Sequence, residues 1–382
     1  MRLFTLAALV ALSSLVAAAA SKTSGLEKIT VRQLQQAMAA ARGKNDADLA
    51  QRLSTFELTE RLSTPLLTQF KASAPGDKSR QALLLLGDKS AFLDLPAESV
   101  PADPAPDAAA TRKMLVQIVN YVNTTLRQLP NLVAARETTG FEDRPQEDSL
   151  EATGLVSYSY QPLHFVGRSL ATVTYRDRKE VVEAGADKTA KQGANVGGLT
   201  TTGEFGPILS TTLADALKGR ITWARWEPGA TEKVAVFHYS VPDEKSDYRV
   251  RFCCIVNSYD ANGQPDLQVF DERAPYHGEI AFDPADGSIL RLTLQAELPP
   301  HDLVSNAGLM MEYAPVEIAG KSYVCPARGI SVLAAHTTQP HGMYSKTNYQ
   351  GPSKTFLNDV AFGQYRRFGS EARILVGENP AP

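Results

Sequence analysis

The chain has 382 residues and a formal net charge of −3, from 39 Lys and Arg against 42 Asp and Glu. This balance argues against a nucleic-acid-binding protein that relies on a basic surface. Apolar residues make up 43% of the chain and charged residues 21%, a globular composition that can bury a core. The length is enough for two ordinary domains, and the composition excludes no protein partner.

The first twenty residues have the pattern of a removable export signal. Arg2 gives a positive start, an apolar stretch runs from Leu3 to Val16, and alanines offer a cut between Ala20 and Ser21. The stretch is shorter than the roughly 20 apolar residues that span a membrane, and no later run is long enough. We therefore expect a signal peptide at 1–20 and a periplasmic or extracellular protein without a transmembrane segment in the mature chain.

A helical region is predicted for residues 21–130. Thr30 and Gln33 can form a capping box at the start of the first helix, and Asp107 is a good N-cap for the longest one. Between them, several prolines predict an extended connector. Apolar spacing predicts helices at 31–42, 78–86 and 108–129.

A near-repeat of nine residues stands inside this region, at 51–59 and again at 60–68. Both copies contain serine and threonine that suit the start of a helix, so they predict two short helices with a leucine stripe in the core. The predicted caps are Ser54 or Thr55 in the first copy and Ser63 or Thr64 in the second.

From residue 131 the apolar period changes to two, which predicts an antiparallel sheet over 131–370 followed by a tail at 371–382. In the clearest strand, Leu292 and Leu294 face one way while Arg291 and Thr293 face the other, a pattern typical of a strand with one wet face. The predicted strands are 133–141, 163–175, 220–226, 233–241, 248–255 and 289–298.

Three further segments complete the expected fold. Long loops rich in Gly, Thr and Pro are predicted at 184–207 and 337–353, and a helix at 209–217 can cover the sheet. The fold class is therefore α+β, with an N-terminal helical region followed by a curved, mostly antiparallel sheet and a covering helix.

Three cysteines in an oxidising compartment predict one disulfide and one remaining thiol. Strand alternation turns Cys254 to the buried face of its segment, away from Cys253, and Cys325 lies in a second strand-like segment. The preferred bridge is therefore Cys254 to Cys325. The alternative is a pair of unpaired core cysteines.

Sequence motifs after residue 130 carry a family resemblance, and they include Val173 to Asp177, Gly203 to Pro207, Val236 to Pro242 and Tyr313 to Glu317. The chain resembles a group of uncharacterised exported proteins common in acidobacterial genomes, which implies a location and an architecture but no catalytic residue. The order of hairpins is also similar to the curved sheet of Lol-type lipoprotein carriers, which hold acyl chains on the concave face. The N-terminal helices depart from those carriers.

The patterns of common catalytic sites are absent from the sequence. A P-loop, a dinucleotide-binding glycine motif, a GxSxG elbow and HExxH do not occur, and the six histidines have no spacing that points to one metal. We expect no catalytic residue, metal or cofactor. Trp223 and Trp226 are predicted on opposite faces of a strand, so that at most one belongs to the core and the other can touch a ligand.

Three classes of function remain. The first is a non-catalytic protein that binds an apolar or lipid-like ligand on the curved sheet. The second is a structural module whose helical half docks on an envelope partner, which an exposed apolar patch would favour. The third is an enzyme without a recognisable motif, so the sequence leaves catalysis open and leans against it.

Overall fold

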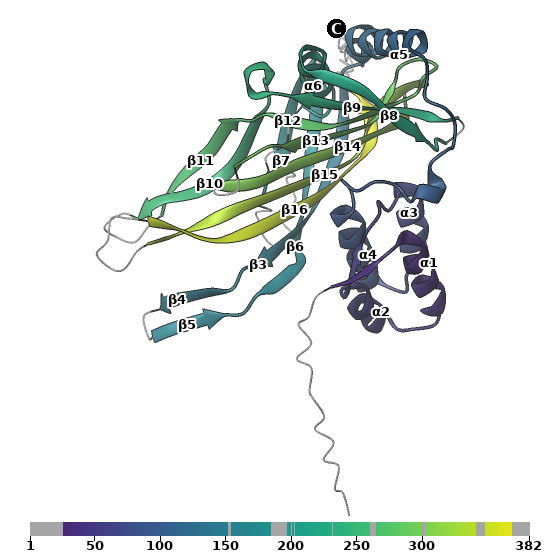
Figure 1. Cartoon of the computed structure of the whole chain (residues 1–382). Coiled ribbons are helices and arrows are strands. Elements are labelled where there is room, and N and C mark those ends of the chain that lie inside the picture. Colours follow the sequence, from purple (N-terminus) through teal and green to yellow (C-terminus); the bar gives the residue numbers. More distant parts are fainter. Residues whose placement is uncertain are drawn as a thin grey trace, which may run out of the picture.

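The protein has the predicted α+β fold, built around one large antiparallel sheet (Figure 1). The computed structural model describes residues 26–151, 154–184, 197–199, 201, 203–230, 232–259, 265–299, 303–340 and 348–368. The predicted signal peptide, the predicted tail and most of the predicted loop at 184–207 lie outside the described residues. The division of the chain at residue 130 stays a prediction.

Four N-terminal helices pack around their own core (Figure 1). The first begins as predicted, because Thr30 accepts a hydrogen bond from the backbone of Gln33 while the Gln33 side chain accepts one from the backbone of Thr30. The predicted connector holds a short turn of 3-10 helix at Ala97–Ser99. The helices are α1 (Val31–Ala40), α2 (Asp46–Leu53), α3 (Thr64–Ser73) and α4 (Asp77–Lys89).

The two copies of the near-repeat have different structures. The second copy starts α3 after Ser63, as predicted. The prediction for the first copy is wrong: Asn45 caps α2 earlier by accepting from the backbone of Asp48, so the copy holds the end of α2 and then β2 (Phe56–Leu58). Strand pairing explains why residues 56–58 are extended and not helical, because β2 pairs in parallel with β1 (Glu27–Ile29).

Ten strands form the main sheet in the order β7-β6-β3-β16-β15-β14-β13-β12-β9-β8. Two further hairpins extend from it, β4 with β5 and β10 with β11. A 3-10 turn at Asp243–Lys245 precedes β10. The strands are β3 (Leu132–Arg144), β4 (Glu147–Glu151), β5 (Gly154–Tyr158), β6 (Gln161–Arg176), β7 (Lys179–Ala184), β8 (Arg220–Glu227), β9 (Val234–Val241), β10 (Arg249–Tyr259), β11 (Pro265–Arg273), β12 (Tyr276–Phe282), β13 (Ile289–Ala296), β14 (Val304–Ile318), β15 (Lys321–Pro340) and β16 (Asn348–Arg367).

The predicted loop at 337–353 is largely strand. β15 continues to Pro340 and β16 starts at Asn348, and the two pair as one long hairpin. The local composition of Gly, Pro and polar residues indicated a loop, but the ladder between the two strands extends regular structure into it.

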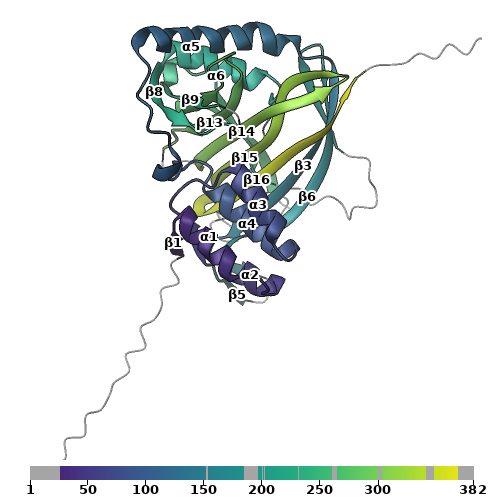
Figure 2. The same cartoon turned by 90° about the vertical axis from the view of Figure 1, so that its right-hand side faces the viewer.

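Two helices cover one face of the sheet, which we call the inner face, and the strands curve around α6 (Figure 2). These helices are α5 (Ala108–Asn120) and α6 (Pro207–Lys218), which confirms the helix predicted at 209–217. The chain continues from α5 through a π-helical turn at Tyr121–Thr125 and a 3-10 turn at Leu126–Gln128. The inner face presents apolar side chains that include Phe237, Tyr276, Phe282, Leu292 and Leu294. Among the described residues, every helix is too short or too polar to cross a bilayer.

The opposite face, which we call the outer face, carries the four N-terminal helices near β13 to β15. Ala91, which follows α4, packs there with Met310 and Ile330. The prediction of a wet face on β13 is therefore wrong, because Arg291 and Thr293 are both buried beneath this layer. A polar residue in a strand predicts exposure only when nothing covers its face, and here the N-terminal helices cover it.

A glycine in the middle of the sheet should tolerate no side chain. A Cβ atom on Gly278 of β12 would lie 1.9 Å from the Thr293 carbonyl oxygen, which also accepts a hydrogen bond from the Tyr239 hydroxyl. We expect Gly278→Ala to destabilise the protein by about 1–3 kcal/mol, because the backbone must shift. The control is Gly363→Ala, where a Cβ atom meets nothing within 4 Å. Urea denaturation of both variants checks this, and equal midpoints would contradict it.

Candidate functional site: a crevice on the outer face

A crevice of about 360 Å³ lies between the N-terminal helices and the outer face of the sheet. We call it the interlayer crevice. Its helix side comes from the segment that leads into α3 and from the residues around the end of α4. Its sheet side comes from β9, β12, β13, β14 and β15 and from the turn after β8. The lining residues are Arg61, Leu62, Ser63, Thr64, Pro65, Gly87, Ala91, Leu95, Glu227, Pro228, Gly229, Ala230, Val234, Ala281, Leu290, Arg291, Met310, Glu312, Arg328 and Ile330.

The walls of the crevice are largely apolar. Strand alternation places Ala281 of β12 and Met310 of β14 on the outer face, and a bulge between β12 and β13 brings Leu290 to the same side. Leu62 and Leu95 face them from the helix layer. A largely apolar crevice of this size falls within the range of small-molecule sites, which measure about 300–1000 Å³.

A buried network of charges forms part of the lining of the crevice. Its centre is Glu227, the last residue of β8, whose side chain is 7% exposed. One oxygen, Oε2, accepts from Arg61 Nη2 at 2.7 Å and from Arg291 Nη1 at 2.9 Å. The other, Oε1, accepts from Arg225 Nη2 at 2.7 Å and from Arg291 Nη2 at 3.0 Å. This carboxylate therefore joins the helix layer to β8 and β13.

A second carboxylate, Glu279 of β12, completes this network. It forms a bidentate pair with Arg225, at 2.7 and 2.8 Å, and accepts from Arg291 Nη2 at 2.9 Å. Three guanidinium groups thus share two carboxylates. Bidentate pairs of this kind fix orientation as well as charge, so we expect the network to be rigid.

The charges of the network shift its pKa values. Burial alone would raise the pKa of Glu227, but the positive charge of Arg291, helped by Arg61 and Arg225, lowers it to about 2. Burial, with the charge of Arg291, lowers the pKa of Arg61 to about 10. Both groups remain charged near neutral pH. Glu227 and Arg61 therefore form an ion pair near neutral pH.

A second set of polar residues, around Arg328, also lines the crevice. Arg328 of β15 pairs with Asp88 of α4 and donates from Nε to Asp359 of β16 at 2.7 Å. Thr64 accepts from Arg328 and donates to Glu312 of β14 at 2.7 Å. Burial, reinforced by the charge of Asp359, raises the pKa of Asp88 well above its usual range.

The crevice therefore combines apolar walls with polar groups that already have partners. Three atoms of these groups, Nε of Arg225, Nε of Arg291 and Oδ2 of Asp88, are buried without a hydrogen-bond partner among the described residues. The arrangement is suited to holding a molecule in place. Within the described part of the chain, no group of His, Cys, Asp and Glu could hold a metal ion.

The two tryptophans lie elsewhere, on the inner face. A bulge in the pairing of β8 with β9 falls between Trp223 and Arg225, so Trp223 and Trp226 point the same way with ring centroids 4.8 Å apart. The prediction of opposite faces is wrong for this reason. Trp226 donates from Nε1 to the carbonyl oxygen of Pro104 at 3.0 Å. A ligand contact by either ring stays a prediction.

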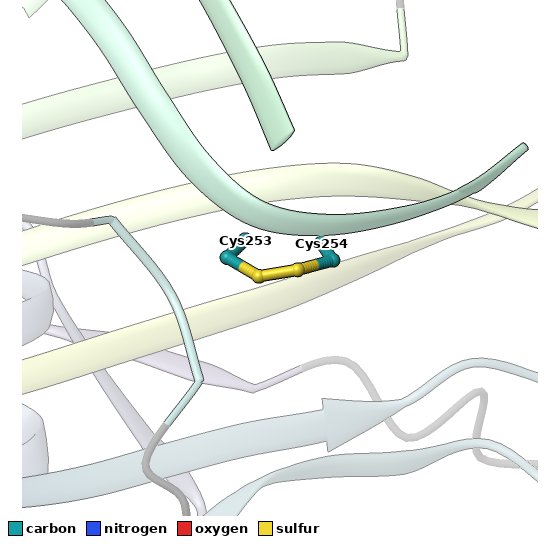
Figure 3. The surroundings of a disulfide bond; sticks show 2 residues. All are labelled: Cys253 and Cys254. Atoms are coloured by element: carbon teal, nitrogen blue, oxygen red, sulfur yellow. A yellow bond between two sulfur atoms is a disulfide. The ribbon is translucent and has the colours of Figure 1, made fainter. Parts of the chain in front are cut away.

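The disulfide of the structure joins the neighbouring residues Cys253 and Cys254 in β10, and Cys325 is a buried free thiol (Figure 3). The predicted Cys254 to Cys325 bridge is therefore not formed. The preceding part of β10 packs on β15 near Leu333, through Phe252. Eight residues of strand separate Leu333 from Cys325, about 25 Å, whereas the Cα atoms of a disulfide lie within about 7 Å.

Sequence analysis missed the residues that form the crevice. Arg61 stands in the second copy of the near-repeat and Glu227 directly follows Trp226, and neither was predicted to belong to a site. One signal was present, because Arg225 and Arg291 are charged residues inside predicted strands, whereas Glu279 lies in a segment for which no strand was predicted. Opposite charges on several strands of one sheet are able to pair, but the pairing partners depend on strand order.

Comparisons with known proteins do not show a family. No family model and no curated protein matches the sequence. Among the solved structures, a domain from Vibrio parahaemolyticus described as an outer membrane lipoprotein-sorting protein matches at 12% identity. The match covers 67% of this chain and 94% of that chain, with a TM-score of 0.19. Similarity at this level carries no argument about function, and the resemblance to exported acidobacterial proteins stays a prediction.

Proposed function

We propose that this protein is a non-catalytic binding protein of the cell envelope that holds a small, largely apolar molecule in the interlayer crevice. The observation that carries the proposal is the crevice itself, about 360 Å³ in volume, with largely apolar walls and charged lining residues that are ion-paired. An apolar molecule gains free energy by leaving water for such walls, at about 25 cal/mol for each Å² that it buries.

The proposal moves the binding site from one face of the sheet to the other. The inner face was expected to hold the ligand, but its apolar side chains pack against α5 and α6. Phe237, Phe282 and Leu294 of that face are almost completely buried by protein. In the crevice on the outer face, apolar side chains line an open volume.

A docking role for the N-terminal helices has less support. The large apolar side chains of α1 to α4 are buried or half-buried in their own core, and none of them is exposed. An exposed apolar patch on these helices was the feature that would have favoured a docking module.

The test fills the crevice with a larger side chain. Leu290 is half-buried and lines the crevice, so Leu290→Trp should occupy part of the volume. With the neutral fluorescent probe N-phenylnaphthylamine, we expect saturable binding to the wild type and a Kd raised at least about tenfold in the variant, or about 1.4 kcal/mol. Native mass spectrometry of the wild type purified from a periplasm, followed by solvent extraction, identifies the natural ligand.

The control carries the same substitution elsewhere. Leu217 of α6 is 51% exposed and does not line the crevice, so Leu217→Trp should bind the probe as the wild type does. Circular dichroism shows that both variants are folded. Equal affinity of the Leu290→Trp variant and the wild type would overturn the location of the site, and absence of saturable binding would overturn the function.

A further inference from the structure

A second cavity, of about 390 Å³, adjoins the interlayer crevice. The two share Arg61 and Ala91, so they lie side by side on the outer face with Arg61 between them. The residues that follow α4 border both cavities: Leu95 lines the first, and Leu93 and Asp94 line the second. We call the second cavity the histidine groove, because His238 and His277 form part of its floor.

The register of the sheet brings the two histidines together. β9 and β12 are antiparallel neighbours in which His238 pairs with Glu279 and His277 pairs with Ser240. The histidines are thus diagonal neighbours on one face, a relation that separates residues by about 7–8 Å. Their side chains are 54% and 47% exposed, so both are accessible to a molecule in the groove.

Each histidine points one ring nitrogen at a carboxylate. His238 Nδ1 lies 3.4 Å from Glu279 Oε1, and His277 Nδ1 lies 3.0 Å from Glu297 Oε1. A carboxylate accepts, so a neutral imidazole in this position carries its proton on Nδ1 and keeps Nε2 as an acceptor. The groove therefore presents two acceptor nitrogens, and no described group hydrogen-bonds to either of them.

The surrounding charges disfavour an anion. Asp94 and Glu279 line the groove, and Glu297 lies beside His277. The guanidinium groups nearby are already engaged, because Arg61 is paired with Glu227, and Arg225 is paired with Glu279 and lies 3.7 Å from Asp94. An anionic group would therefore find no free guanidinium among these residues, whereas a hydroxyl or an ammonium group could donate to the two Nε2 atoms.

We propose that the ligand is an amphiphile whose apolar body occupies the interlayer crevice and whose hydrogen-bond-donating end, a hydroxyl or an amine, lies in the histidine groove. This inference rests on the proposed function, because it needs the apolar body to bind in the crevice. It adds the chemical class of the ligand, which the crevice alone does not specify.

The test compares three amphiphiles with the same twelve-carbon chain, dodecanol, dodecylamine and dodecanoate, as competitors of N-phenylnaphthylamine. We expect dodecanol, dodecylamine or both to displace the probe at concentrations at least about tenfold lower than dodecanoate, a difference of about 1.4 kcal/mol in binding free energy. The two favourable competitors distinguish a hydroxyl from an ammonium end. Equal or stronger displacement by dodecanoate would overturn the proposal.

A double variant tests the groove itself. His238→Phe with His277→Phe removes both acceptors while leaving the crevice unchanged, so we expect the preference over dodecanoate to fall to within about twofold with unaltered affinity for the probe. His164→Phe, on β6, is the control and should keep the preference. A preference that survives the double variant contradicts the inference and leaves the proposed function intact. If the wild type did not bind the probe at all, the result would instead contradict the proposed function.

Discussion

Glu227→Ala is expected to destabilise the protein by about 3–5 kcal/mol, the usual cost of removing one partner from a buried ion pair. Glu227 accepts four hydrogen bonds from three guanidinium groups. Without Glu227, Arg61 would lose the carboxylate with which it is paired. Arg225 and Arg291 would then have only the carboxylate of Glu279 to share. The free energy of unfolding, measured by urea denaturation, checks this value.

The matched control is Glu317→Ala. Glu317 is an exposed residue of β14, so its removal should change the free energy of unfolding by less than about 0.5 kcal/mol. Glu227→Gln separates charge from shape, because it keeps the size of the side chain and removes the negative charge. We expect the loss of unfolding free energy in Glu227→Gln to lie between the losses in Glu227→Ala and Glu317→Ala. A loss below about 1 kcal/mol for Glu227→Ala would mean that the network does not tie the helix layer to the sheet.

A rise in pH from about 5 to about 9 is expected to destabilise the protein through Glu180 of β7. Burial raises the pKa of Glu180 to about 8 from an ordinary value of 4.5, helped by a hydrogen bond that protonated Glu180 donates to Glu204 and by the negative charge of Glu204. Glu204 itself is 2% exposed, and its Oε1 atom lies 3.5 Å from Arg136 Nη2. Two hydrogen-bonded carboxyl groups cannot both ionise without strong repulsion, so Glu180 and Glu204 retain one proton between them.

The sign follows from proton linkage. Between pH 4.5 and pH 8 the folded state holds a proton that the unfolded state has released. The stabilisation is therefore fully present below the unfolded pKa and is lost as the pH rises through the folded pKa. One unit of pKa shift corresponds to about 1.4 kcal/mol, so the loss should be on the order of a few kcal/mol.

Glu180→Gln should remove most of this pH dependence, because an amide keeps the shape of the protonated carboxyl group and does not ionise. Glu183→Gln is the control, since Glu183 is exposed on the same strand. The measurement is the free energy of unfolding in urea at about pH 5, 7 and 9. Parallel pH profiles for the wild type and Glu180→Gln would show that this carboxyl pair does not hold the proton.

The sequence by itself determined the features that depend on neighbours along the chain. Thr30 and Gln33 are three residues apart, and Asp107 caps α5 by accepting from the backbone of Ala110. Such hydrogen bonds form within one turn, so the residue types alone predict where a helix begins. The period of two likewise predicted the strands and the antiparallel α+β class, because the alternation of side chains in a strand is local.

The tertiary structure decided which surfaces are covered and which distant residues meet. Arg61 and Glu227 are separated by 166 positions, and only the packing of the helix layer on the outer face brings them together. One inserted residue at the bulge in β8 moved Trp223 to the face of Trp226. The sequence predicted that Arg291 lies on a solvent-exposed face, but Arg291 is buried. The sequence shows the polarity of a side chain but does not show which part of the protein packs against it. The crevice depends on that covering layer, and so the tertiary structure alone reveals it.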